Sequence, residues 1–179
     1  MESNTQSPKE PKFQISEQMI QARMENFRFE QNIGLGIIGG SIGGLIGAAV
    51  WAAITYFTEY QLGLLAIGVG FLVGYGVRKL GKGIDKIFGV AGGIIALVSI
   101  VLGNFLASIG FLAKILEVGY LDMLITFNYA LTFELMKETF AVMDLLFYAI
   151  AIYEGYRVSF RKITREQLLE GAITKPGLQ

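Results

Sequence analysis

Residues 33–57 read IGLGIIGGSIGGLIGAAVWAAITYF, 25 residues without a single charged side chain. A helix of about 20 apolar residues, rising about 1.5 Å per residue, crosses a bilayer core about 30 Å thick. This stretch is therefore long enough to cross a membrane as one helix, and it decides the fold class that we expect for the chain.

The composition of the whole chain favours the same environment. Of its 179 residues 53% are hydrophobic and only 17% are charged, against about 25% charged in soluble domains. Basic and acidic residues balance at 15 each, so nothing in the charge indicates a nucleic-acid partner. The chain has no cysteine and no histidine, which excludes disulfides, Cys or His catalysis and metal sites built on these ligands. We therefore expect no cofactor, no metal and no catalytic residue.

Three further segments resemble the first in apolar character. The four predicted spans are residues 33–57, 62–77, 88–113 and 139–158. The second is short, and the fourth contains two acidic residues. The chain is therefore predicted to be all-α, with an integral membrane bundle of four transmembrane helices over residues 33–158.

The segments outside the spans are more polar. In the N-terminal tail, residues 1–32, Ile20, Met24 and Phe27 recur at the spacing of one helix face and predict a short amphipathic helix. Residues 159–179 form a C-terminal tail. The remaining segment, 114–138, has helical periodicity interrupted by polar residues, and we expect an interfacial or re-entrant helix over 120–136 on the outer face.

The basic residues predict the orientation of the bundle. If both termini are cytoplasmic, thirteen of the fifteen Lys and Arg residues lie inside, and only Lys114 and Lys137 lie outside. Lys and Arg concentrate in the cytoplasmic loops of membrane proteins. We therefore expect cytoplasmic N- and C-termini.

Small residues recur at every fourth position of the first three spans, which contain seventeen of the 23 glycines. This spacing lets two helix backbones approach closely in a membrane. It predicts contacts within the chain's own bundle, a seam between copies of the chain, or both, and a further reading places glycine carbonyls along a pore. The predicted helix-packing residues are Gly36, Gly40 and Gly44, then Gly39, Gly43 and Gly47, then Gly70, Gly74, Gly93 and Gly103.

Few polar side chains lie within the predicted spans. Asp144 and Glu154 are the acidic ones, and an intramembrane carboxylate is costly and usually either functional or paired. Arg157 follows Glu154 by three residues, which favours a local ion pair, and Asp144 is placed to cap the fourth span near a lysine on the outer side. Asn104 is expected to make an interhelical hydrogen bond. These four residues form the candidate intramembrane polar site, and proton or cation handling by the carboxylates is the alternative to a structural role.

Two glycine-rich stretches imitate nucleotide-binding motifs. The GLGIIG sequence of residues 34–39 lies inside an apolar span rather than after a strand, and GVRKLGKG at 76–83 ends in glycine where a P-loop has its Mg²⁺-binding hydroxyl. We expect neither to bind a nucleotide. The second predicts a basic loop that contacts anionic lipid head groups.

Four stretches carry a further pattern. They read WAAITYFTEYQLGLLAIGVGFLVGYGVR at residues 51–78, GKGIDKIFGVAGG at 81–93, LGN at 102–104 and DLLFYAIAIYEGYR at 144–157. Together they resemble an uncharacterised family of small, glycine-rich bacterial multi-spanning membrane proteins. The resemblance implies a multi-pass topology and a bacterial cytoplasmic (inner) membrane, and it implies no activity.

These observations predict a non-enzymatic integral membrane protein. It would contact the lipid bilayer and either form a homo-oligomer or dock a membrane-protein partner through its Gly-xxx-Gly faces, without nucleic acid. The alternative is a small ion or solute channel or carrier that uses Asp144 or Glu154 in a wet cavity. An enzyme is the third hypothesis, and its one compatible form is a reaction on lipid head groups at the outer face.

Overall fold

The computed structural model describes residues 17–60 and 62–169, and every regular element in these ranges is a helix. The all-α prediction is confirmed for this part of the chain, while parts of both predicted tails lie outside it. All three prolines also lie outside it, at positions 8, 11 and 176, so none interrupts a described helix. The elements are α1 (Glu17–Phe29), α2 (Ile33–Thr58), α3 (Leu65–Gly81), α4 (Lys86–Ile115), α5 (Tyr120–Thr126), the 3-10 helix η1 (Tyr129–Leu131), α6 (Thr132–Thr139), α7 (Val142–Val158) and α8 (Arg165–Leu169).

The chain divides into two units, one with α1 and α8 and the other with residues 30–161. In the first unit, Arg23 Nε donates to the backbone oxygen of Gln167 at 3.4 Å, and the Arg23 guanidinium lies 5.5 Å from the centre of the Phe27 ring. The predicted short helix is present, since α1 includes Ile20, Met24 and Phe27. Phe27 is buried and Ile20 is exposed.

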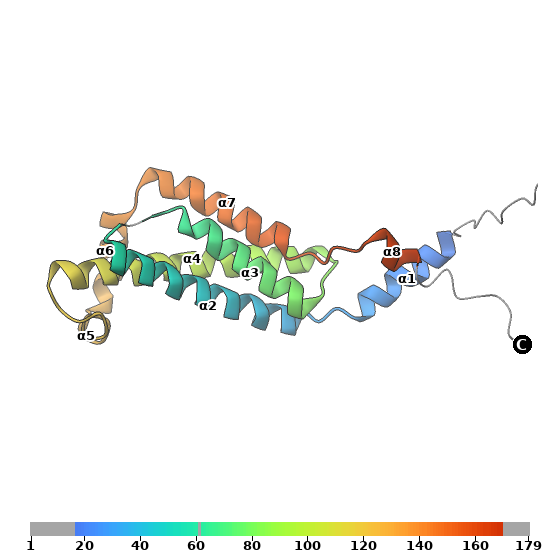
Figure 1. The fold of residues 1–179 in the computed structure, drawn as a ribbon, viewed down its shortest axis with the longest axis horizontal. Helices are drawn as coiled ribbons and strands as arrows, with labels where there is room; N and C mark the ends of the chain where they lie inside the picture. Colours follow the sequence, from blue (N-terminus) through green and yellow to red (C-terminus); the bar gives the residue numbers. More distant parts are fainter. Residues whose placement is uncertain (1–16, 61, 170–179) are drawn as a thin grey trace, which may run out of the picture. The chain divides into compact units, whose positions relative to one another are not determined.

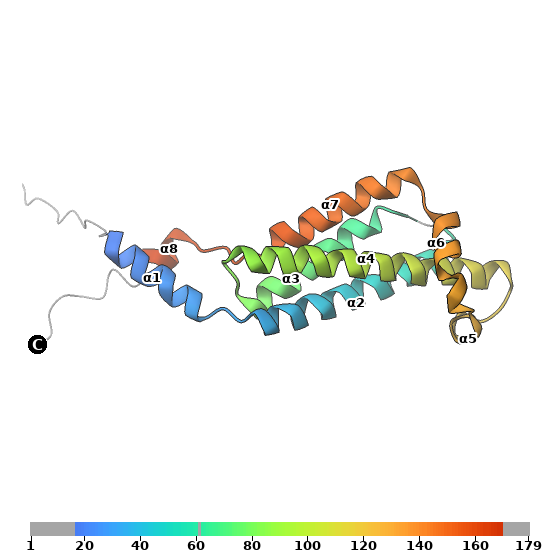
Figure 2. The same ribbon diagram turned by 180° about the vertical axis from the view of Figure 1, so that it is seen from behind.

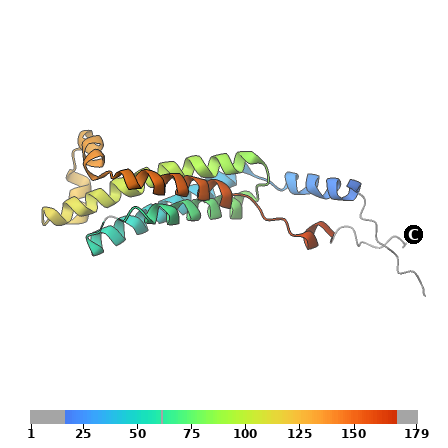
Figure 3. The ribbon, with the colours of Figure 1, turned by 90° about the horizontal axis from the view of Figure 1, so that it is seen from above.

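The second unit is built on four long helices, α2, α3, α4 and α7, which run side by side (Figures 1 and 2). α2 and α4 are parallel, because Gly36 lies against Phe88 near their starts and Gly44 lies against Ser99 about two to three turns later. α3 and α7 run in the opposite direction, alongside them (Figure 3). Successive long helices therefore alternate in direction.

The helix ends follow local capping chemistry. α2 begins after Asn32, whose side chain accepts a hydrogen bond from the Leu35 N–H at 2.9 Å. The C-cap residues of α2 and α3 are Glu59 and Lys82, both in the left-handed conformation with φ of 62° and 49°. The second long helix thus covers Leu65–Gly81 rather than residues 62–77, because residues 62–64 form a turn ahead of it.

The segment between α4 and α7 differs from the single helix predicted over residues 120–136. It consists of α5, η1 and α6, and α5 ends at Phe127, which is extended. Asn128 then starts η1, because its side-chain oxygen accepts from the Ala130 N–H at 3.2 Å. α7 begins at Val142 rather than at 139, since Phe140 and Ala141 are extended.

The bundle has small residues in its interior and large apolar residues on its outer surface. Its buried positions are mainly Gly, Ala, Val and Ser, whereas large aliphatic side chains face outward on several helices: Leu45 is 59% exposed, Val98 62% and Leu145 64%. Among the described residues, α2 and α4 are the two helices long and apolar enough to cross a membrane, judged by length and composition. α3 and α7 have 17 residues each and are shorter than that measure requires.

Candidate functional site in the bundle interior

The glycines at positions 39, 43 and 47 of α2 face the backbone of α3. A Cβ atom added at Gly39 would lie 2.9 Å from the carbonyl carbon of Gly76, and one added at Gly43 would lie 2.8 Å from the carbonyl carbon of Leu72. Real Cβ atoms do not occupy such positions. α2 and α3 therefore approach more closely than any residue larger than glycine allows at these points.

The glycines at positions 36, 40 and 44 of α2 face side chains of α3 and α4. A Cβ atom added at Gly36 would lie 3.3 Å from the ring of Phe88, and one added at Gly44 would lie 2.9 Å from Cβ of Ser99. Gly40, between them, is buried as well. Both glycine ladders of α2 thus make contacts within the chain's own bundle, as one of the predicted readings has it.

α7 packs on glycines of α3 and α4. A Cβ atom added at Gly70 would lie 2.9 Å from Cα of Ala151, and one added at Gly74 would lie 2.8 Å from Cβ of Val158. Gly93 meets α7 more loosely, with its nearest α7 atom 3.6 Å from the added Cβ. α3 is therefore held between α2 on one side and α7 on another.

Sequence reasoning missed a second close contact between α4 and α7. A Cβ atom added at Gly92 would lie 3.1 Å from Cβ of Ser159, a buried residue whose hydroxyl donates to the Gly155 backbone oxygen at 2.6 Å. One added at Gly155 would lie 2.7 Å from Cβ of Ala96. Gly155 and Ser159 are four residues apart, so the small-residue spacing used for the other spans could have found them.

A buried polar cluster joins α4 to α7. Asn104 is 2% exposed, and its side-chain amide donates a hydrogen bond to the Tyr148 hydroxyl. The Ser108 hydroxyl, also buried, donates to Oδ1 of Asn104 at 3.3 Å. The interhelical hydrogen bond expected of Asn104 is present. Its partner, Tyr148, was missed because a tyrosine in an apolar span carries no spacing signal of its own.

Two polar atoms of α2 are buried without a hydrogen bond in the described part of the chain. They are Nε1 of Trp51 and Oγ1 of Thr55, one helical turn apart. The Trp51 ring lies against Gly103, since a Cβ atom added there would be 2.9 Å from it, and Gly103 precedes Asn104 directly. A buried donor or hydroxyl without a partner costs about 1–3 kcal/mol, so both atoms lower the stability of the bundle.

The two carboxylates of α7 lie near opposite ends of the helix, and each contacts a group three residues away in the chain. Asp144 is the third residue of α7 rather than its N-cap, which is Ala141, and its carboxylate accepts from the Ala141 N–H at 2.9 Å. Oε2 of Glu154 lies 3.0 Å from the Arg157 guanidinium, so the ion pair expected from their spacing is present. The structure therefore brings Asn104 together with Tyr148, not with Glu154 or Arg157.

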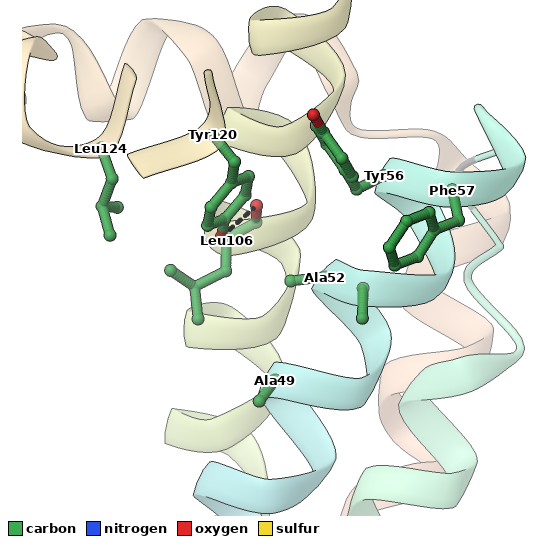
Figure 4. Close-up of a pocket in the computed structure, with 8 residues that line it drawn as sticks. Ala49, Ala52, Tyr56, Phe57, Leu106, Tyr120 and Leu124 are labelled. Carbon is green, nitrogen blue, oxygen red and sulfur yellow. Dashed lines mark hydrogen bonds between the residues drawn. The ribbon is translucent and has the colours of Figure 1, made fainter. Parts of the chain in front are cut away.

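An apolar cavity of about 430 Å³ lies at the end of the bundle where α2 finishes. Alanines of α2 form one wall, and Tyr120 of α5 closes another, with its hydroxyl donating to the Leu106 backbone oxygen at 3.2 Å (Figure 4). Sequence reasoning missed this cavity because α5 had no predicted contact with α2. The residues that line it are Ala49, Ala52, Ala53, Tyr56, Phe57, Leu106, Tyr120 and Leu124.

Burial changes the acidity of one group at this cavity. It raises the pKa of the Tyr120 phenol above its ordinary value of 10.0, because the charged form loses hydration. Lys114 lies at the same end, with Nζ 4.9 Å from the centre of the Tyr56 ring and 3.7 Å from Oε1 of Glu59. Within the described residues no group of three or more acidic, His or Cys side chains could hold a metal ion.

Comparisons with known proteins found no matching family model, no matching curated protein and no matching solved structure. The resemblance to the glycine-rich membrane family therefore stays a prediction, and the function is argued from the geometry of this chain.

Proposed function

We propose that the chain is a non-enzymatic, multi-pass integral membrane protein whose helices α2, α3, α4 and α7 cross a lipid bilayer. The observation that carries the proposal is the distribution of residues in the bundle, which has small residues inside and large apolar residues on its outer surface. Leu45, Phe71, Val98 and Leu145, one on each helix, are all at least half exposed. Exposed apolar surface costs about 25 cal/mol per Å² in water, and hydrocarbon around the bundle would remove that cost.

The antiparallel arrangement supports four crossings even though α3 and α7 are short. Each has 17 residues, or about 25 Å of helix, against a hydrocarbon core about 30 Å thick. Both lie alongside the longer helices α2 and α4. Local thinning of the bilayer and snorkelling of Arg78 and Lys79, which lie in the last turn of α3, would accommodate a difference of this size.

Basic side chains support cytoplasmic termini. At the end of the bundle where α2 begins, Glu30 Oε2 lies 3.9 Å from Lys82 and 2.8 Å from Arg161. The opposite end carries Lys114 and Lys137, the two basic residues placed outside by this orientation. A bacterial inner membrane is proposed from the family resemblance alone.

Single-cysteine labelling tests this topology, because the chain has no native cysteine. In intact cells, a membrane-impermeant thiol reagent is expected to label Glu59→Cys and to spare Lys82→Cys until the cells are permeabilised. Equal labelling of both before permeabilisation would overturn the orientation. A purified chain that stays monodisperse in buffer without detergent would overturn the membrane location itself.

We further propose a scaffold role in which a second copy of the chain packs on the outward face of α2. The glycine ladders are occupied inside the bundle, so the contact would use Ile38, Ile42 and Leu45, each at least half exposed and spaced along one face. The absence of Cys and His from the sequence supports a role without catalysis by either residue. This face replaces the Gly-xxx-Gly seam predicted from the sequence.

Cysteine crosslinking tests the scaffold role. Oxidised membranes containing Ile42→Cys are expected to yield disulfide-linked dimers, whereas Leu145→Cys, equally outward-facing on α7, is expected to yield few. No dimer at either position, or equal dimer at both, would contradict a specific contact through α2. Gly43→Leu is not a useful test, because Gly43 faces the Leu72 backbone of its own chain.

The polar cluster supports a second candidate function, passage of protons or a small polar solute. Tyr148 lies one turn after Asp144 and bonds Asn104, which in turn accepts from Ser108, so polar groups extend from the outer end of α7 into the core. In liposomes, a flux that falls with Asp144→Asn and Asn104→Leu would favour this candidate. Glu154→Gln is the control, since Glu154 pairs with Arg157 away from the cluster. A flux that is absent, or indifferent to all three changes, would eliminate it.

A further inference from the structure

We propose that the cavity between α2, α4 and α5 binds one acyl chain of a bilayer phospholipid with a zwitterionic headgroup. The inference rests on the membrane location proposed above. The cavity of about 430 Å³ falls within the range of about 300–1,000 Å³ typical of ligand sites.

The lining selects a hydrocarbon chain. Among the described residues, no charged side chain lines the cavity, and the Tyr120 hydroxyl is already engaged with the Leu106 backbone oxygen. The outward face of α2 changes from Ile38, Ile42 and Leu45 to alanine at positions 49 and 53, all exposed, so the cavity opens sideways beside that face. An unfilled hollow there would forfeit dispersion contacts, and the nearest material able to fill it is the chain of a neighbouring lipid.

The charges beside the cavity select the headgroup. Lys114 lies over the ring of Tyr56, a lining residue, and pairs with Glu59 at 3.7 Å. Both side chains are partly exposed, so each can take another partner. One cation and one anion side by side complement a phosphate linked to an ammonium group, whereas an anionic headgroup would meet the Glu59 carboxylate without compensation.

Photolabelling of the full chain in vesicles tests the site. The probe is a phosphatidylethanolamine with a diazirine in its acyl chain, present as a minor component of vesicles of phosphatidylethanolamine and phosphatidylglycerol. Labelling per exposed residue is expected to be about tenfold higher over residues 49–57 and 120–124 than over 142–150 on α7, because an enclosed chain buries more methylene groups than one on a flat surface. Ala53→Phe should fill the cavity and abolish the excess, while Ala149→Phe, a change at an exposed alanine of α7, should preserve it.

Charge reversal tests the headgroup. Labelling by the phosphatidylethanolamine probe should exceed labelling by a matched phosphatidylglycerol probe, and Glu59→Lys should reverse the order. A wild-type preference for the anionic probe, or an order unchanged by Glu59→Lys, would overturn the zwitterionic assignment.

The remaining outcomes separate this inference from the membrane proposal. Equal labelling of the cavity segments and of residues 142–150 would overturn the lipid site and leave the membrane location supported. No labelling of any of these segments would overturn the membrane location. Low labelling of residues 49–57 together with disulfide-linked dimers of Ala53→Cys would show that a second copy occupies the cavity, and would overturn the lipid site as well.

Discussion

Gly39 and Gly76 pack backbone against backbone at the contact between α2 and α3. A Cβ atom on Gly39 would lie 2.9 Å from the carbonyl carbon of Gly76, and one on Gly76 would lie 2.6 Å from the carbonyl carbon of Gly39. The requirement for glycine is therefore reciprocal. A backbone cannot retreat as a flexible side chain can, so the distance between these two helices depends on both residues.

Gly39→Ala is expected to destabilise the bundle by about 1–3 kcal/mol, because the added methyl group forces two backbones apart. Gly68→Ala is the matched control within a neighbouring long helix. A Cβ atom there meets nothing within 4 Å, and alanine is favoured over glycine in a helix by about 0.5–1 kcal/mol. In thermal unfolding in detergent, followed by circular dichroism, the unfolding temperature should lie below that of wild type for Gly39→Ala and above it for Gly68→Ala. Equal effects would show that α2 and α3 are not in close contact.

Tyr148→Phe is expected to weaken the bundle by about 1 kcal/mol, because Asn104 loses the hydroxyl that its amide contacts while remaining buried. The control is Tyr153→Phe, on the same helix, where the side chain is exposed and little change is expected. A double-mutant cycle with Asn104→Leu measures the coupling directly. Additive effects in that cycle would mean that the two side chains do not interact in the folded protein.

Thr55→Val is expected to stabilise the bundle by about 1 kcal/mol, since it replaces a buried hydroxyl without a hydrogen bond by a methyl group of similar size. Thr58→Val serves as the comparison on the same helix. The Thr58 hydroxyl is exposed and donates to the Ile54 backbone oxygen at 2.7 Å, so its loss should leave stability unchanged or slightly lower. If Thr55→Val destabilises instead, the hydroxyl has a partner in the native protein, and a bound water or polar solute at this level would be the first to seek.

Stability should fall at high pH in a way that depends on Tyr120. Burial raises the pKa of its phenol in the folded state above 10.0, so the folded chain holds this proton more tightly than the unfolded chain. The corresponding stabilisation is complete below pH 10 and is lost as the pH rises from about 10 through the higher folded pKa. Tyr120→Phe should flatten this part of the pH profile of the unfolding midpoint. An unchanged slope would mean that Tyr120 is hydrated and does not close the cavity.

Much of the bundle could be predicted from local sequence. The apolar runs beginning at Ile33 and Phe88 correspond to α2 and α4, because a long uncharged run without proline has few other ways to satisfy its backbone groups. The ends of the helices were harder to predict. Backbone hydrogen bonds of residues 65–67 to residues 62–64 form the turn before Leu65, and the side chain of Asn128 caps the 3-10 helix that follows the break at Phe127. Such local contacts outweigh a helical periodicity of apolar residues over a short segment.

The candidate site could be predicted from the sequence only in part. Glu154 and Arg157 are three residues apart on one helix, so their pairing follows from spacing. The contacts of Asn104 with Tyr148, and of Tyr120 with Leu106, join helices whose relative rotation no local pattern specifies. The cavity likewise exists because α5 folds back against α2 and α4, a consequence of the breaks around it.

By itself, the sequence determined the composition of the surfaces: where apolar runs lie, where glycines line one side of a helix, and where charges are excluded. These properties depend on neighbours along the chain and on the 3.6-residue period of a helix. Only the tertiary structure decided which helix meets each glycine ladder, that both ladders of α2 are used within one chain, and where a hollow remains. Those outcomes depend on the simultaneous fit of four helices, because each backbone contact fixes the rotation and separation at which the next can form.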